Sequence, residues 1–187
     1  MVSFVRLELT LGEVKGLLER HAKNYPGSAA LEAAGRSLVK GNFDPQASAA
    51  FVRRVCEWGR GHRIIGRVLR DNSAGEISGA LRCGHELALA GRIAEGVARI
   101  SGLERLGQSF ASKQLRFLAP HRAVILDAVI RSNLGYPETQ DGYDEFLGDC
   151  QTLLVHAQAT EALDVGYRES LRVCDIEAAV FAKIQGY

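Results

Sequence analysis

The chain has 187 residues, of which 47% are hydrophobic and only four are proline, a composition that suits one compact domain with a buried core. Its formal charge of +1 conceals an uneven distribution. Residues 53–71 carry six Arg against two acids, residues 99–131 carry six Lys or Arg against two acids, and residues 138–187 carry ten acids against three bases. Basic segments followed by an acidic end favour an anionic partner on one face, although solvated helix faces explain the same pattern equally well.

Features that the sequence lacks exclude several classes of protein. No apolar run approaches the ~20 residues that a membrane-spanning helix needs. The histidines show no ligand spacing, and neither a phosphate-binding loop nor a dinucleotide fingerprint is present, so we expect no metal and no cofactor. With no signal peptide and no C-x-x-C pair, we expect a cytoplasmic protein with free thiols at Cys56, Cys83, Cys150 and Cys174. We also expect a monomer.

The first half of the chain predicts a succession of helices after a short strand or extended arm over residues 1–10. Apolar residues recur with the helical period of about 3.6 rather than the strand period of 2. Capping residues and glycine or proline breaks delimit the helices. We expect them over residues 10–25 with Thr10 as the cap, 28–40, 45–58 with Asp44 as the cap and Pro45 at the first position, 64–69, 76–89 and 93–100.

The last third of the chain continues the same pattern. We expect a polar loop over residues 138–142, a helix over 143–159, and one further helix that starts at Glu161 or Gly166 and ends at Ile184. The predicted class is therefore all-α, a compact multi-helix domain with no internal repeat.

The most distinctive stretch lies between these parts, from Ile100 to Arg131. A turn with glycines at Gly102 and Gly107 leads into a helix of small and apolar residues, which Pro120 ends. The short apolar run 123–126 is followed by a single carboxylate, Asp127, at the expected start of another helix.

The order SFASKQLRFLAP followed by ILD resembles the helix-hairpin-helix DNA glycosylase superfamily, and most of all the bacterial proteins described as 8-oxoguanine DNA glycosylases. The resemblance implies one glycosylase-like domain over residues 1–187, with the hairpin and catalytic segment at 100–131. It implies a hairpin that grips the DNA backbone and an Asp that serves the chemistry. The closely spaced four-cysteine iron–sulfur loop of endonuclease-III-like relatives is absent here.

The hairpin is the predicted contact with DNA. Glycine in the turn lets backbone N–H groups approach a phosphate, and the following helix presents its positive end, so we expect Gly107, Gln108 and Ser109 to bind DNA. The family's usual hairpin reads L-P-G-V-G. Here Glu104 and Arg105 separate two leucines and the first glycine is displaced, so an ordinary helical turn remains the alternative.

Asp127 is the predicted catalytic carboxylate. A carboxylate beside a flipped nucleotide stabilises positive charge on the sugar as the N-glycosidic bond stretches, and can orient or deprotonate a nucleophile. The alternative is that Asp127 only caps a helix, a role worth about 0.5–2 kcal/mol.

Lys113 is the second predicted catalytic residue, because it is the only lysine between Lys40 and Lys183. Alignment of Gly107 with the family's glycine puts Ser109, not Lys113, at the position of the nucleophilic lysine of bifunctional enzymes. Since residues four apart share a helical face, Lys113 can reach back over one turn. A monofunctional enzyme in which Asp127 activates water, and a protein in which Lys113 only contacts phosphate, stay open as alternatives.

The segment CEWGRGHR contains the only tryptophan of the chain, Trp58, together with Arg60 and Arg63. An aromatic ring beside arginines can stack on an extruded base or wedge the duplex, so we expect these three residues to contact DNA. The alternative, a tryptophan buried at a helix end with arginines that face solvent, explains the segment at least as well.

The sequence thus predicts a DNA glycosylase that excises a damaged base from duplex DNA, with 8-oxoguanine as the first candidate and with lyase activity if Lys113 is the nucleophile. One alternative is a helix-hairpin-helix protein that binds DNA without cutting it. A further alternative is an interaction protein whose acidic terminal helices bind a partner.

Overall fold

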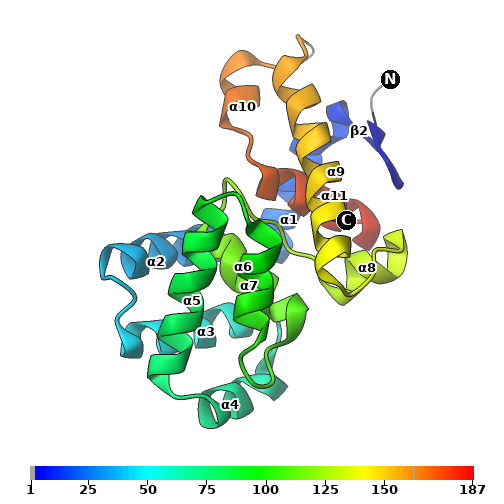
Figure 1. Ribbon diagram of the computed structural model, residues 1–187. Helices are drawn as coiled ribbons and strands as arrows, with labels where there is room; N and C mark the ends of the chain where they lie inside the picture. Colours follow the sequence, from blue (N-terminus) through cyan, green and yellow to red (C-terminus); the bar gives the residue numbers. More distant parts are fainter. Residues whose placement is uncertain (1–2, 162) are drawn as a thin grey trace.

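The computed structural model describes residues 3–161 and 163–187, and within them the protein is all-helical apart from one β-hairpin (Figure 1), which confirms the predicted all-α class. The hairpin pairs β1 (Ser3–Phe4) with β2 (Leu7–Thr10) in antiparallel register. The helices are α1 (Leu11–Asn24), α2 (Ser28–Lys40), α3 (Pro45–Trp58), α4 (His62–Asp71), α5 (Ala74–Leu89), α6 (Ile93–Ser101), α7 (Gly107–Leu118), α8 (Ala128–Leu134), α9 (Gln140–Ala159), α10 (Val165–Ser170) and α11 (Val173–Gln185). None of these helices is both long enough and apolar enough to cross a membrane.

The helices form two groups. We call residues 28–118, which carry α2–α7, the central body; the terminal body comprises residues 3–27, 119–161 and 163–187. In the central body α5 packs against α3 and α6, and α7 packs against α2 and α6. In the terminal body α11 packs against α1, α8 and α9. Figure 1 shows the cyan-to-green central body below the terminal body. In the terminal body the blue start of the chain lies beside its yellow, orange and red end.

Helix α7 runs through the core of the molecule. All of its residues from 111 to 118 are buried, and four of them are polar or charged: Ser112, Lys113, Gln114 and Arg116. Gly35 lets α2 approach this helix, because a Cβ there would lie only 2.2 Å from the carbonyl oxygen of Phe117. Since buried polar groups need partners, the polar side chains of α7 must find theirs inside the protein.

The segment between α7 and α8 is extended and buried, and side chains hold it in place. The hydroxyl of Tyr143, on α9, accepts a hydrogen bond from the backbone N–H of Val124 at 3.1 Å and donates one to the carbonyl oxygen of the same residue at 2.9 Å. The hydroxyl of Ser112, on α7, accepts a hydrogen bond from the N–H of Leu126 at 3.2 Å. These contacts fix the position of the next residue, Asp127, relative to both bodies.

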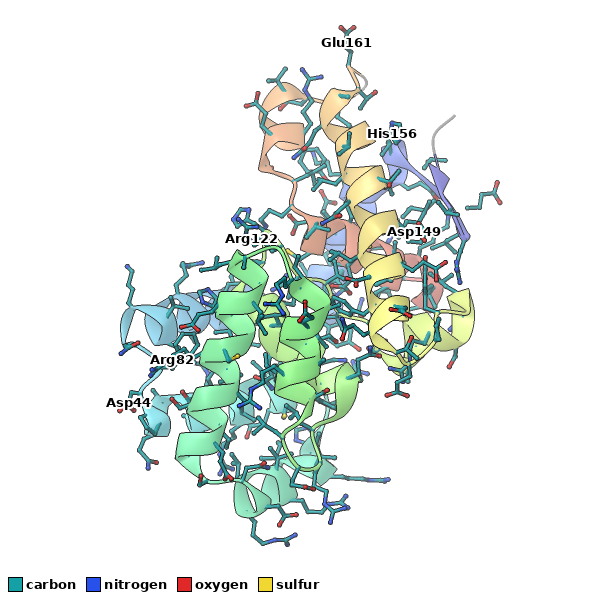
Figure 2. The ribbon with its side chains drawn as sticks, in the orientation of Figure 1. Asp44, Arg82, Arg122, Asp149, His156 and Glu161 are labelled. Carbon is teal, nitrogen blue, oxygen red and sulfur yellow. The ribbon has the colours of Figure 1, made fainter. Side chains whose placement is uncertain are left out.

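Most of the predicted helix starts are confirmed together with their caps. The predicted bounds 28–40 and 45–58 are those of α2 and α3. Asp44, labelled in Figure 2, accepts a hydrogen bond from the N–H of Ala47 at 2.9 Å. At the start of α1, Glu13 accepts a hydrogen bond from the N–H of Thr10 at 2.9 Å. Local side-chain chemistry was therefore sufficient to place these ends.

Several predicted boundaries were wrong; among them, α5 begins at Ala74 rather than at residue 76, and α4 ends at Asp71 rather than at residue 69. Helix α4 begins two residues early, at His62, and α9 begins at Gln140, inside the expected polar loop, because Thr139 caps it through the N–H of Gly142 at 3.0 Å. The single helix expected to end at Ile184 is broken into α10 and α11. At the break Arg172 has an extended backbone, and its guanidinium group binds Asp175 at 2.9 Å.

Candidate active site

Lys113 and Asp127 form a buried ion pair at the junction of the two bodies. Lys113 comes from α7 and Asp127 from the start of α8, and Lys113 Nζ lies 3.1 Å from Asp127 Oδ2. Their side chains are 7% and 15% exposed. The amine also lies 3.4 Å from Ser109 Oγ, one helical turn back. The structure therefore brings together three residues that the sequence analysis named separately.

Asp127 has a distinct partner for each of its carboxylate oxygens. Oδ1 accepts hydrogen bonds from the backbone N–H groups of Val129 at 3.0 Å and Ile130 at 3.2 Å, which makes Asp127 the N-cap of α8. Oδ2 faces Lys113 instead. Asp127 thus caps α8 and pairs with Lys113 at the same time, and the cap fixes the direction in which Oδ2 points.

The loop after Trp58 packs directly on Lys113. A Cβ at Gly59 would lie 2.9 Å from Lys113 Cδ, and a Cβ at Gly61 would lie 2.5 Å from Phe110 Cζ. The amine of Lys113 lies 5.2 Å from the centre of the Phe110 ring. The two glycines therefore let the loop close over α7 and restrict where the lysine side chain can go.

A cavity of about 40 Å³ opens beside the ion pair. It is lined by His21, Tyr25, Trp58, Gly59, Lys113, Arg116, Ile125, Asp127, Glu177, Ala178 and Phe181. The Tyr25 ring lies 5.3 Å from the Trp58 ring and 5.5 Å from the Phe181 ring, centre to centre. The indole Nε1 of Trp58 is buried and makes no hydrogen bond to any described residue. These rings and this unsatisfied donor suit a planar polar ligand.

The cavity holds water-sized molecules as it stands. A nucleobase would fit only after a side chain moved, and Tyr25 is placed to be that side chain. A second cavity of about 370 Å³ lies next to the first and shares Tyr25, His21, Arg116 and Ala178 with it. Because Tyr25 lines both spaces, a change in its rotamer would enlarge the space beside Lys113.

Sequence reasoning did not single out three charged or titratable residues of the cavity as functional: His21, Arg116 and Glu177. Burial, with the positive charge of Arg116 acting in the same direction, lowers the pKa of His21 to about 4, so this imidazole is neutral at pH 7. Burial raises the pKa of Glu177 to about 8. One sequence feature could have identified Glu177, because it is the only acid in the apolar stretch 176–182.

The hairpin residues lie close to the site but have different partners. Gly107 is exposed at the start of α7 with a φ of 63°. Gln108 is occupied within the protein, because its Nε2 donates to the carbonyl oxygen of Thr139 at 2.7 Å and its Oε1 accepts from Arg131 at 3.3 Å. It therefore ties the first turn of α7 to the start of α9, a role that the sequence did not suggest.

Trp58, Arg60 and Arg63 differ in their surroundings. The Trp58 ring packs edge-on against Phe117, with 4.8 Å between the ring centres, so it lies inside the cavity wall rather than on the open surface. Arg60 and Arg63 are exposed, and within the described residues neither makes an ion pair. The Arg60 guanidinium group lies 4.9 Å from the centre of the Tyr25 ring.

Comparison of the chain with protein-family models, with curated proteins and with solved structures finds no significant match.

Proposed function

We propose that this protein is a DNA glycosylase that removes a modified base from duplex DNA, with Lys113 and Asp127 as its catalytic residues. The observation that carries the proposal is the buried pair itself: an amine 3.1 Å from a carboxylate, at the wall of a cavity lined with aromatic rings. Glycosylases need a carboxylate near the sugar and stacking surfaces for an extruded base. Oxidised guanine is the first substrate to test.

Asp127 supports two routes for the chemistry. In the first, Lys113 passes a proton to water, and its amine attacks the sugar carbon C1′ while the base departs; opening of the sugar ring then gives an imine. In the second, Asp127 activates a water molecule and Lys113 remains a cation. In both, the carboxylate stabilises positive charge on the sugar. The amine of Lys113 lies 3.4 Å from Ser109 Oγ. Because the resemblance puts Ser109 at the position of the nucleophilic lysine, this short distance supports the first route.

The DNA contacts in this proposal come from the central body. Helices α6 and α7 pack against each other and are joined by the short turn 102–106, an arrangement that suits a helix-hairpin-helix motif with Gly107 at its exposed end. Arg60 lies over Tyr25, at the edge of the cavity, and Arg63 follows one residue into α4. These exposed cations are suited to phosphate, which holds DNA without reading its sequence.

One observation favours the alternative, a protein that binds DNA without cutting it. The cavity of about 40 Å³ is too small for a base in this conformation, and the amine of Lys113 is neutralised by Asp127. In that case Lys113 and Asp127 would serve only to join α7 to α8.

Trapping of an imine tests the proposal. A duplex that contains 8-oxoguanine, incubated with the protein and borohydride, should give a stable protein–DNA adduct, and Lys113→Gln should abolish it. Lys183→Gln is the matched control, because Lys183 also pairs with a carboxylate, that of Glu13, but outside the cavity. The control should leave the adduct at the level of the unmodified protein.

The outcomes separate the routes. Release of free base without an adduct would assign the protein to the monofunctional route. Neither adduct nor free base on oxidised, alkylated or deaminated duplexes would contradict the glycosylase proposal, and the DNA-binding alternative would replace it.

A further inference from the structure

Glu177 is a second carboxyl group in the wall of the cavity that contains Lys113 and Asp127, and its surroundings differ from those of Asp127. We propose that Glu177 is the general acid that delivers a proton to the departing base. This inference rests on the proposed glycosylase function and adds a residue and a step to it. It stands on the placement of one carboxyl group in the wall of the cavity that holds the Lys113–Asp127 pair.

Among the described residues, Glu177 has no counter-ion of its own. It is 3% exposed and belongs to α11, whose residues 176–182 are all buried. Its carboxyl group receives a hydrogen bond from the backbone N–H of Ile125. The two cations in the same cavity wall have other partners, because Arg116 is paired with Glu32 at 2.8 Å and Lys113 with Asp127 at 3.1 Å. A charged carboxylate at this position would therefore be costly.

The proton is consequently retained at neutral pH. Burial raises the pKa of Glu177 from 4.5 to about 8, and the negative charge of Asp127 acts in the same direction, while Arg116 and Lys113 oppose it. The charged and titratable groups that face Glu177 from the surrounding elements are Lys113 and Arg116 on α7, Asp127 before α8, Tyr143 and Cys150 on α9, and His21 on α1.

The two carboxyl groups thus suit opposite tasks. Asp127 only accepts hydrogen bonds, from two backbone N–H groups and from Lys113, and is arranged as a carboxylate. Glu177 sits in the same cavity wall without an ion-pair partner among the described residues and keeps its proton. A pair of carboxyl groups held in different protonation states is the arrangement that divides acid from base or electrostatic roles.

The step balances without any further reactant. The bond between C1′ and the base nitrogen breaks, and its electron pair moves to the base. The proton of Glu177 passes to a nitrogen or oxygen of the base, so that the base leaves neutral and Glu177 becomes a carboxylate. The positive charge left on the sugar faces Asp127. A new bond to C1′ removes this charge, formed either by the deprotonated amine of Lys113 or by a water molecule that releases a proton to solvent. Solvent returns the proton to Glu177 after the base has left.

The test is the pH dependence of single-turnover base release from a duplex that contains 8-oxoguanine. For the unmodified protein the rate should fall as pH rises through about 8, because Glu177 then loses its proton. Glu177→Gln, which keeps the size of the side chain, should be about 100- to 1,000-fold slower and should lack this alkaline decline. Glu169→Gln, an exposed acid on α10, is the control for the change in charge.

Stability gives a second readout that does not need activity. A carboxyl group whose pKa is raised by folding binds more protons in the folded state between pH 4.5 and about 8, so its contribution to stability is lost as pH rises across that window. The difference in Tm between Glu177→Gln and the unmodified protein, variant minus unmodified, should therefore increase from pH 5 to about pH 8. Carboxyl carbon NMR of the unmodified protein reports the same titration if the variant does not fold.

Each outcome decides something. Base release by Glu177→Gln within about twofold of the unmodified protein, with the alkaline decline intact, would overturn the role of Glu177 and leave the glycosylase function standing. A Glu177 carboxyl that titrates below pH 6 by NMR would also overturn it. If the unmodified protein releases no base at all, the glycosylase function itself fails and the role of Glu177 fails with it.

Discussion

The central and terminal bodies contrast in charge and in what they bring to the cavity. Residues 28–118 carry 14 Lys or Arg against 8 acids, whereas the rest of the chain carries 9 against 14. Asp149 and Glu161, both on the terminal body, belong to this acidic excess (Figure 2). The cations that line the cavity, Lys113 and Arg116, come from the central body, and both carboxyl groups come from the terminal body. The candidate site therefore exists only where the two bodies meet.

This division separates binding from chemistry. Under the proposed function, the exposed arginines of the central body bind DNA even if the cavity is altered. The terminal body supplies the carboxyl groups and most of the aromatic wall, namely Tyr25 and Phe181, to whatever the central body holds. Variants of the exposed arginines in the central body should thus change affinity for DNA, and variants of the carboxyl groups in the terminal body should change the rate. Variants at the junction, where Lys113 lies, should also change the rate.

The largest effect should come from Asp127→Asn in the terminal body. Base release should fall by at least about 1,000-fold, because the variant removes the charge that stabilises the sugar. Asn can still cap α8, but Lys113 is left with a buried charge, so Tm should fall by roughly 5–10 °C. DNA affinity should stay within about threefold, as measured by fluorescence anisotropy.

The matched control for Asp127→Asn is Glu13→Gln, which breaks a lysine–carboxylate pair that lies within the terminal body, with Lys183, outside the cavity. It should leave base release unchanged. If Asp127→Asn kept full activity, the division of roles between the two bodies would be wrong.

The second effect should come from the central body. Arg60→Glu with Arg63→Glu should weaken binding to any duplex by about 10- to 100-fold and reduce the slope of log affinity against log salt by about 2, because each phosphate contact releases about one counterion. A titration at several salt concentrations measures both quantities. Arg20→Glu with Lys23→Glu, on exposed positions of α1, makes the same change of charge in the terminal body. An equal loss of affinity in that control would mean that net charge alone governs binding.

The smallest effect should come from the junction. Gly59→Ala places a methyl group 2.9 Å from Lys113 Cδ and 3.1 Å from Phe110 Cε1, so the lysine side chain must shift. Adduct formation should slow by about 10-fold while DNA affinity stays unchanged, because the loss is one of alignment. Gly66→Ala on α4, where a Cβ meets nothing within 4 Å, is the control and should be neutral or slightly stabilising. Unchanged trapping in Gly59→Ala would show that the loop does not position the amine.

The sequence was sufficient for features that depend on neighbouring residues. The helical period and the caps Thr10, Asp44 and Asp127 are local, and the structure has all three at helix starts. Lys113 and Asp127 were singled out from a stretch of about thirty residues that also contains the turn between them. Their contact follows from the short connection, since the chain has only thirteen residues between the two positions.

Features that depend on distant residues could not be predicted. Glu177 and Phe181 reach the cavity because α11 packs on α1 and α8, and His21 and Tyr25 reach it from the other end of the chain. The break at Arg172 depends on Glu32, 140 residues away, which pairs with its guanidinium group at 2.8 Å. Gln108 looked free for a phosphate because its partner Thr139 belongs to another helix. Helical periodicity indicates which residues are buried, but not which other residues they pack against.

The extended segment that carries Asp127 makes the junction observable without any ligand. The N–H of Val124 is bonded to Tyr143 of the terminal body, and the N–H of Leu126 to Ser112 of the central body. Each amide donates its hydrogen bond to a side chain rather than to a neighbouring strand. Their hydrogen–deuterium exchange therefore reports on two different packing contacts. Faster exchange at Leu126 alone marks a separation from α7, and faster exchange at Val124 alone marks a separation from α9. Two amides, two residues apart, thus report independently on how each body holds Asp127.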